Sequence, residues 1–255
     1  MPFDLVTIPC LSDNYAFLLH DGASGQTLLV DVPEAAPILA ELAKRNWTVS
    51  HVLLTHHHPD HVQGLQALLE VHSAQVIGAA ADAHRLPDLH LALSEGDHFN
   101  FAGEAATIYD VSGHTLGHIA AYFPTTGIAF TGDSLMALGC GRLFEGSPTQ
   151  MWASLSKLMR LPPATTICSG HEYTAANARF ALSLEPGNEN LAARAATIEA
   201  ARAKNQPTVP SKLSDELATN PFLRPHSAEI RNLLKMRNYK DSEVFAEIRR
   251  RKDTF

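Results

Sequence analysis

Short runs of hydrophobic residues alternate with polar turns over the first two thirds of the chain. Runs of strand length bounded by Gly, Asn, Asp and Ser predict strands at Asp4–Ile8, Tyr15–His20, Thr27–Val32, His51–Thr55, Gln75–Ala79, Thr107–Val111, Ile119–Phe123 and Ile128–Thr131. Helical spacing predicts helices beginning near Pro33 and covering Val62–Val71 and Met151–Leu161. The pattern therefore favours a strand-rich first part with a few helices.

The pattern changes after about Tyr173. Helical spacing recurs at Ala175–Leu184, Leu191–Lys204, Ala228–Met236 and Ser242–Arg250. No strand is predicted among these helices, and a stretch with four prolines, Gln206–Pro225, links the two pairs. Strands first and helices alone afterwards predict an α+β chain with two domains, at 1–173 and 174–255.

Composition and charge narrow the function classes. A formal net charge of −7 argues against a nucleic-acid partner, which would need a basic surface. No apolar run is long enough for a membrane span, and the N-terminus lacks the pattern of a secretory signal. Three cysteines without a CxxC pair are typical of a reducing compartment. We therefore expect a cytoplasmic protein without membrane association. We also expect a monomer, although the sequence shows no coiled-coil pattern or exposed apolar face that would indicate an oligomeric state.

Four of the fourteen histidines lie within His56–His61, directly after a predicted strand. In an extended segment alternate residues point the same way, so His56 and His58 can converge on one point. A turn into a helix at Pro59 would direct Asp60 and His61 towards a second point. Two such nitrogen-rich half-sites suit cations such as Zn²⁺. A histidine-rich surface loop without metal is the alternative, and the aspartate and the preceding strand argue against it.

Three more candidate ligands, His114, Asp133 and His171, each follow a glycine at the end of a strand. Glycine lets the backbone turn sharply, so each side chain can project from a loop. Taken singly, each has an ordinary explanation as a structural histidine or a turn residue, but their joint occurrence favours metal ligands. His118 and Asp31 are candidates for orienting a ligand histidine from outside the metal shell.

The pattern THxHxDH, followed by GH, TGD and a second GH, resembles the metallo-β-lactamase superfamily. That resemblance implies a four-layer αβ/βα sandwich with two metal ions at one edge of its sheets. It implies the following ligand sets: His56, His58 and His114 for the first metal, Asp60, His61 and His171 for the second, and Asp133 as a bridge. Ligand type favours two divalent zinc ions, with iron or manganese as alternatives.

Other segments extend the resemblance over the whole chain. The segments GCGRLFEG at 139–146, GHEYT at 170–174 and NPFLR at 220–224 are similar to glyoxalase II, the hydroxyacylglutathione hydrolase family. The family hydrolyses S-D-lactoylglutathione to D-lactate and glutathione, the second step of methylglyoxal detoxification. The resemblance thus implies a small all-α C-terminal domain that helps to bind glutathione.

The same resemblance implies that Arg142, Tyr173, Arg249 and Lys252 bind the substrate. Arg249–Lys252 is the densest basic run in an acidic chain, and Arg can hold a carboxylate through two parallel hydrogen bonds. The alternative is a basic helix terminus that complements the helix dipole. Two positions depart from the family pattern: Arg142 stands where many relatives have Lys, and Phe144 where they often have Tyr.

Two metals sharing a bridging water would lower its pKa enough to give hydroxide at neutral pH. Asp60 would orient this hydroxide, Asp133 would hold both metals, and the hydroxide would attack the thioester carbonyl. Three alternatives stay open at this point. Two are enzymes on the same scaffold, a glutathione-persulfide dioxygenase and a lactonase. The third is a non-catalytic metal-binding protein.

Overall fold

The computed structural model describes residues 3–255. Met1 and Pro2, part of the N-terminus where we expect no secretory signal, lie outside the described residues. The chain forms two compact units. The first contains the described residues up to Val111 together with Leu116–Gly132, and the second contains Ser112–Thr115 together with Asp133–Phe255. These contacts group the residues differently from a boundary near residue 173, and that boundary stays a prediction.

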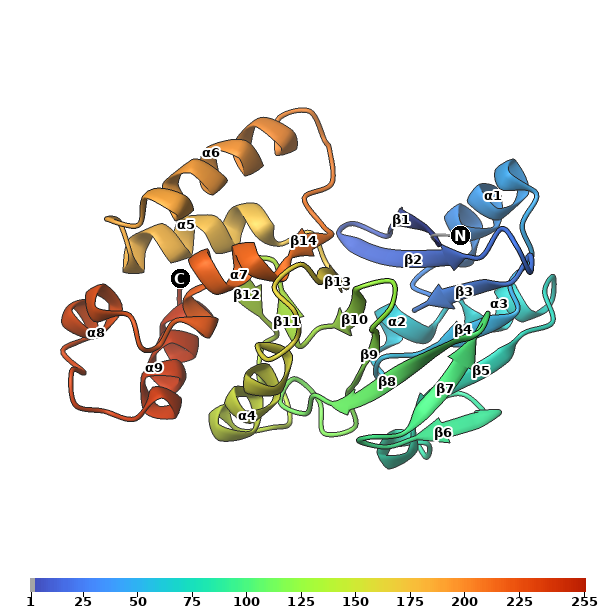
Figure 1. Cartoon of the computed structure of the whole chain (residues 1–255), viewed down its shortest axis with the longest axis horizontal. Coiled ribbons are helices and arrows are strands. Elements are labelled where there is room, and N and C mark those ends of the chain that lie inside the picture. Colours follow the sequence, from blue (N-terminus) through green and yellow to red (C-terminus); the bar gives the residue numbers. More distant parts are fainter. Residues whose placement is uncertain (1–2) are drawn as a thin grey trace. The chain divides into compact units, whose positions relative to one another are not determined.

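The first unit begins with six strands hydrogen-bonded in chain order (Figure 1). These are β1 (Asp4–Cys10), β2 (Asn14–His20), β3 (Thr27–Val30), β4 (His51–Leu53), β5 (Gln75–Ala79) and β6 (Leu91–Leu93). The first three are antiparallel, and β3 to β6 run parallel. Parallel neighbours need crossover connections, and helix α1 (Ala35–Arg45) and the 3₁₀ helix η1 (Ala80–Asp82) lie in two of them.

Four antiparallel strands complete the first unit. In the order β10-β9-β8-β7 they are β10 (Ile128–Gly132), β9 (Ile119–Phe123), β8 (Glu104–Asp110) and β7 (His98–Phe101). Aromatic side chains join the two sets of strands: the rings of Phe17 and Phe130 lie 5.8 Å apart, and those of His51 and Phe101 lie 5.6 Å apart. The core of the first unit therefore lies between the two sets.

The second unit is mostly helical. Its helices are α4 (Pro148–Leu158), α5 (Thr174–Leu184), α6 (Glu189–Arg202), α7 (Leu213–Thr219), the 3₁₀ helix η2 (Pro221–Leu223), α8 (Ala228–Leu234) and α9 (Asp241–Asp253). Its strands are β11 (Leu135–Met136), β12 (Gly139–Cys140), β13 (Thr166–Ser169) and β14 (Ser211–Lys212). Helices α5 and α6 lie side by side in Figure 1, and β11 and β12 form a tight hairpin.

The helix predicted over Val62–Val71 is wrong in its bounds. The structure has two short helices there, α2 (Pro59–Val62) and α3 (Leu65–Leu69). Gly64 separates them, and a Cβ on this residue would lie 2.8 Å from the Ala35 nitrogen and 2.9 Å from the Val32 oxygen. The close packing of this glycine against the loop before α1 therefore sets the break.

The expectation of helices alone after residue 173 is also wrong. Strand β14 lies in the predicted proline-rich link and pairs with β13, the strand that precedes His171. The same link forms α7 and η2. These elements are short and depend on partners distant in sequence, so local periodicity carries little signal for them. None of the helices within residues 3–255 combines the length and the hydrophobicity that a membrane-spanning helix requires.

Candidate metal centre

The first unit brings together the four candidate ligands that follow β4. His56 Nε2 lies 3.1 Å from His58 Nδ1, and His61 Nε2 lies 3.7 Å from Asp60 Oδ2. His56 and His61 are fully buried. The chain is extended through His58, and α2 begins at Pro59, as the spacing predicts. Three imidazoles and one carboxylate thus meet at the end of a buried strand.

Asp31, which follows β3, is hydrogen-bonded to this loop. Its Oδ2 lies 2.8 Å from His61 Nδ1, and its carboxylate also accepts hydrogen bonds from the backbone N–H and the hydroxyl of Thr55, both at 2.8 Å. A carboxylate only accepts, so His61 Nδ1 carries the proton and its Nε2 presents a lone pair. The predicted contact of Asp31 with a candidate ligand histidine is therefore present, and its role in orienting a metal ligand stays a prediction.

His118 also contacts a candidate ligand. Its ring stacks on that of His56, with centroids 4.6 Å apart and an interplanar angle of 15°. Gly132 makes room for this arrangement, because a Cβ there would lie 2.6 Å from Thr55 Oγ1 and 2.8 Å from His118 Cε1. Its φ of +48° also favours glycine. His118 thus supports His56 through ring packing.

Asn14 contacts the candidate ligand Asp60, and the sequence pattern did not identify this residue. Its Nδ2 donates to Asp60 Oδ2 at 2.9 Å and to the Asp60 backbone oxygen at 3.0 Å. It is the first residue of β2, far from Asp60 in sequence. An asparagine at the start of a strand carries no signal of its own, so only the fold reveals this contact.

The second unit brings together the other three candidate ligands. Asp133 Oδ2 lies 3.5 Å from His114 Nε2 and 3.1 Å from His171 Nε2, and all three side chains are buried. His114 Nδ1 lies 2.7 Å from the Arg142 backbone oxygen. A carbonyl oxygen only accepts, so here too Nδ1 carries the proton and Nε2 presents a lone pair. In both units, a hydrogen bond at Nδ1 thus leaves the Nε2 lone pair of a histidine available to bind a cation.

Two aromatic side chains flank this second set. The Tyr173 ring stacks on His171 with centroids 4.7 Å apart, and the Phe144 ring meets His114 edge-on at 5.3 Å. Both aromatic residues are exposed. Phe144 has no hydroxyl group, unlike the tyrosine expected at this position, so the surface beside His114 is apolar here.

Arg249 and Arg142 share one carboxylate. Asp253 Oδ1 lies 2.9 Å from Arg249 Nη2 and 3.4 Å from Arg142 Nε. Arg249 is buried and also donates to the Cys140 backbone oxygen at 2.9 Å, whereas the side chain of Arg142 is 58% exposed. Of the two guanidinium groups, that of Arg142 is the more accessible to a substrate.

Lys252 is half-buried beside α5. Its Nζ lies 3.5 Å from the Ala176 oxygen and 5.4 Å from the Phe180 ring centroid. Burial lowers the pKa of Lys252, and the positive charges of Arg249 and Arg179 lower it further. The second unit therefore gathers several cations whose mutual repulsion an anionic ligand would relieve.

The cysteines do not offer a nucleophile. All three thiols are buried. Burial raises the pKa of Cys10 to about 12 and that of Cys140 to about 11, and it also raises the pKa of Cys168. Because the thiolate is the reactive form, these thiols are inert at neutral pH. The chemistry of the site depends on its histidines and aspartates.

Comparison with known proteins assigns the fold. The family model described as "Metallo-beta-lactamase superfamily" matches residues 13–171. The crystal structure of BLEG-1 B3 metallo-β-lactamase is similar with a TM-score of 0.67 and 19% identity, covering 87% of this chain and 100% of that chain. A structure of TTHA1623 in a di-iron-bound form has a TM-score of 0.54 and 29% identity, covering 66% of this chain and 91% of that chain. The chain therefore has the metallo-β-lactamase fold and is a member of that superfamily.

Two further comparisons identify the family within this superfamily. The family model described as "Hydroxyacylglutathione hydrolase C-terminus" matches residues 172–255. A hydroxyacylglutathione hydrolase from Cereibacter sphaeroides is 63% identical over 255 residues, 100% of both chains. The chain belongs to the hydroxyacylglutathione hydrolase family.

Proposed function

We propose that this protein hydrolyses glutathione thioesters, with S-D-lactoylglutathione as the substrate and D-lactate and glutathione as the products. The observation that carries the proposal is the second unit's combination of buried metal-type ligands with the neighbouring cations Arg142, Arg249 and Lys252. A cation cluster of this kind suits the carboxylates of an anionic peptide. Family membership over the full length supports the same reaction.

The ligand sets fit two divalent metal ions. His56, His58 and His114 would hold the first ion, Asp60, His61 and His171 the second, and Asp133 would bridge them. The fit is supported within each unit: Asp31 and the Arg142 oxygen fix tautomers that present Nε2, and imidazole with carboxylate suits zinc. Iron remains an alternative, supported by the di-iron form of the neighbour TTHA1623, and manganese is a further alternative.

When bound, the two ions would supply a water of lowered pKa and polarise the thioester carbonyl. Asp60 would accept a hydrogen bond from the attacking water and orient it, while Asn14 holds the Asp60 carboxylate in place. The leaving group is a thiolate whose conjugate acid has a pKa of about 8.5, so it departs without a strong general acid. No protonated side chain beside the scissile bond is required.

Binding of the glutathione part would fall to Arg142, Tyr173, Arg249 and Lys252. Arg142 and Tyr173 are exposed, and Lys252 is half-buried and close to other cations. Arg249 is buried against Cys140 and Asp253, so it would contribute charge and hold the surrounding chain. We further propose that the protein acts as a cytoplasmic monomer without a nucleic-acid partner, in keeping with its net charge of −7.

The test is turnover by the metal-loaded protein on matched substrates. Loss of thioester absorbance with S-D-lactoylglutathione, and no oxygen uptake with glutathione persulfide, is the expected result. Oxygen uptake with the persulfide and no thioester hydrolysis would transfer the assignment to a dioxygenase on the same fold. Inertness towards both, with metal bound, would favour lactone hydrolysis or a non-catalytic role.

A further inference from the structure

The hairpin β11–β12 connects the second set of ligands to the helices of the second unit. Asp133 lies just before β11, and Arg142, whose backbone oxygen holds His114 Nδ1, lies just after β12. The end of the hairpin opposite its turn is closed by a backbone hydrogen bond, in which the Gly141 N–H donates to the Ser134 oxygen at 3.1 Å. A Cβ on Gly141 would lie 2.0 Å from the Asp133 oxygen, so the two chain segments are in close contact. The position of the hairpin thus sets the position of Asp133 and the orientation of His114.

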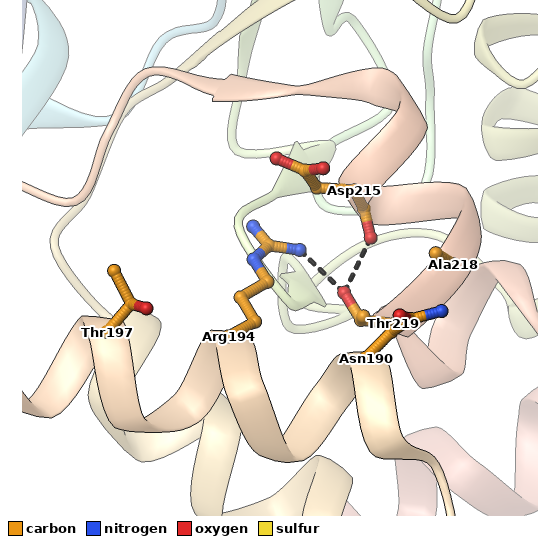
Figure 2. Close-up of a pocket in the computed structure, with 6 residues that line it drawn as sticks. All are labelled: Asn190, Arg194, Thr197, Asp215, Ala218 and Thr219. Atoms are coloured by element: carbon orange, nitrogen blue, oxygen red, sulfur yellow. Dashed lines mark hydrogen bonds between the residues drawn. The ribbon is translucent and has the colours of Figure 1, made fainter.

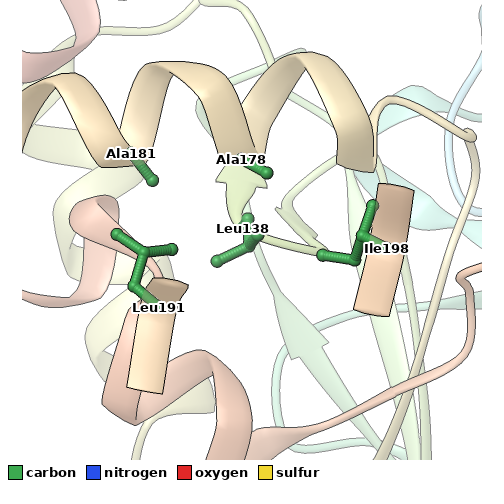
Figure 3. Close-up of a cluster of buried hydrophobic side chains, with 5 residues drawn as sticks. All are labelled: Leu138, Ala178, Ala181, Leu191 and Ile198. Atoms are coloured by element: carbon green, nitrogen blue, oxygen red, sulfur yellow. The ribbon is translucent and has the colours of Figure 1, made fainter. Parts of the chain in front are cut away.

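The turn of the hairpin is inserted among α5 and α6. Leu138 is fully buried and packs with Ala178, Ala181, Leu191 and Ile198 (Figure 3). Its φ is +55°, in the left-handed region that non-glycine residues rarely adopt. Such a conformation persists only where the surroundings fix it, and it is most common at functional sites.

Three polar side chains hold the turn in this conformation through hydrogen bonds. Glu216 Oε2 accepts a hydrogen bond from the Leu138 N–H at 2.8 Å, and Asn177 Nδ2 donates to the Ala137 oxygen at 3.1 Å. Asn220 Nδ2 lies 3.1 Å from the Met136 oxygen, 3.0 Å from the Gly139 oxygen and 3.0 Å from Glu216 Oε2. The backbone groups of the turn are therefore bonded by residues from α5, α7 and the start of η2.

Glu216 is in turn held by α6. Its carboxylate is fully buried and pairs with the Arg194 guanidinium. Figure 2 shows Arg194 on α6 reaching across a pocket to Thr219, to whose hydroxyl it donates a hydrogen bond at 2.7 Å. A buried carboxylate is costly unless it is paired and hydrogen-bonded. This one has a charged partner and two further donors, so it is a fixed acceptor for the turn.

We propose that Glu216 and Asn220 are positioning residues for the metal centre. They hold the Leu138 turn, so that the end of the hairpin opposite this turn places Asp133 and turns the His114 ring through the Arg142 oxygen. This rests on the proposed metal site and goes beyond it: α5–α7 then act on metal binding as well as on glutathione. Groups that hydrogen-bond directly to a metal ligand typically change metal affinity by about 10–100-fold, and Glu216 and Asn220 act one step further out, so a smaller change is expected from them.

The test compares Glu216→Gln with a matched control, Glu185→Gln. Glu185 is likewise buried in the second unit and is bonded to Arg224 and Ser227. Zinc affinity is measured by competition with a chromophoric chelator, without substrate, together with Tm, kcat and KM. We expect both variants to lower Tm. Only Glu216→Gln should weaken zinc binding, by up to about tenfold, and lower kcat with little change in KM.

Equal zinc affinity in wild type, Glu216→Gln and Glu185→Gln would overturn the proposal, because Glu216 would then be only structural. If Glu216→Gln does not fold, Asn220→Ala replaces it: this variant removes the Nδ2 donor shared by the Met136 and Gly139 oxygens without adding a charge beside Glu216. Weakened zinc binding by Asn220→Ala supports the proposal, and unchanged binding overturns it. Because zinc affinity is measured without substrate, a wild type that binds zinc but hydrolyses no thioester would reject the proposed function alone.

Discussion

The two sets of candidate ligands are built in different ways. In the first unit, four ligands come from one short run after β4, and Asp31 holds them from an adjacent strand end. In the second unit, His114, Asp133 and His171 come from three separate loops, and the Arg142 oxygen orients one of them. A local run depends mainly on its own backbone, whereas dispersed ligands depend on the packing that brings the loops together. The second set should therefore be more sensitive to changes in distant residues.

Removal of the proposed bridging ligand should have the largest effect on metal binding and turnover. Asp133→Ala deletes the carboxylate that lies between His114 and His171. We expect bound metal to fall below two ions per chain. We also expect kcat to fall by more than about 100-fold, since changes behind a ligand already cost about 10–100-fold. Metal analysis and steady-state kinetics check this, and full activity in the variant would reject the dinuclear account.

Asp31→Asn tests how firmly the local set is held. The amide would place a donor against His61 Nδ1, so the ring must move its proton to Nε2 or lose the hydrogen bond. Zinc affinity should fall by about 10–100-fold. Asp82→Asn is the matched control, because buried Asp82 makes the same 2.8 Å contact with His57, which is no ligand in our account. Equal losses in both variants would contradict a specific role for Asp31.

Lys252→Met tests the cations of the second unit. Loss of a charge that binds a substrate carboxylate should raise KM about tenfold, roughly 1.4 kcal/mol, with little change in kcat. The pKa of Lys252 is lowered by burial and by Arg249 and Arg179. The cation is therefore lost at a lower pH than for an ordinary lysine, and wild-type KM should rise as pH increases through that pKa. The variant should lack this rise, and an unchanged KM would remove Lys252 from the substrate site.

Asn14→Ala should have the smallest effect on the local set. It removes a hydrogen bond to the Asp60 carboxylate at 2.9 Å. The loss of about 1 kcal/mol corresponds to about a fivefold fall in kcat, because Asp60 keeps its place in the run but is oriented less well. Kinetics at saturating substrate measure this directly. A fall as large as that of Asp133→Ala would show that the local run cannot hold its own geometry.

The difference between the two sets also explains what the sequence could predict. The His56–His61 run directly follows a hydrophobic run of strand length, and the bounds predicted for β5 and β9 agree with the structure. These features depend on residues close together in the chain, so periodicity identifies them. The glycine-preceded ligands could be found as candidates, because a sharp turn after a strand is also a local signal.

Other features depend on contacts between distant segments. The left-handed Leu138 turn, the pairing of β13 with β14 and the Asn14 contact to Asp60 involve partners distant in sequence. The break at Gly64 depends on how closely the loop before α1 approaches. A single sequence reports neither the partner nor the distance, so these features require the fold.

We propose that the ligands of the His56–His61 run and the dispersed ligands together hold two metal ions that support thioester hydrolysis. The most direct test is to titrate metal-free protein with zinc while following bound metal and turnover of S-D-lactoylglutathione. We predict two ions per chain, loss of turnover on chelation, and its return when both ions are restored. Full turnover with a single ion per chain, or in the metal-free protein, would contradict a dinuclear site.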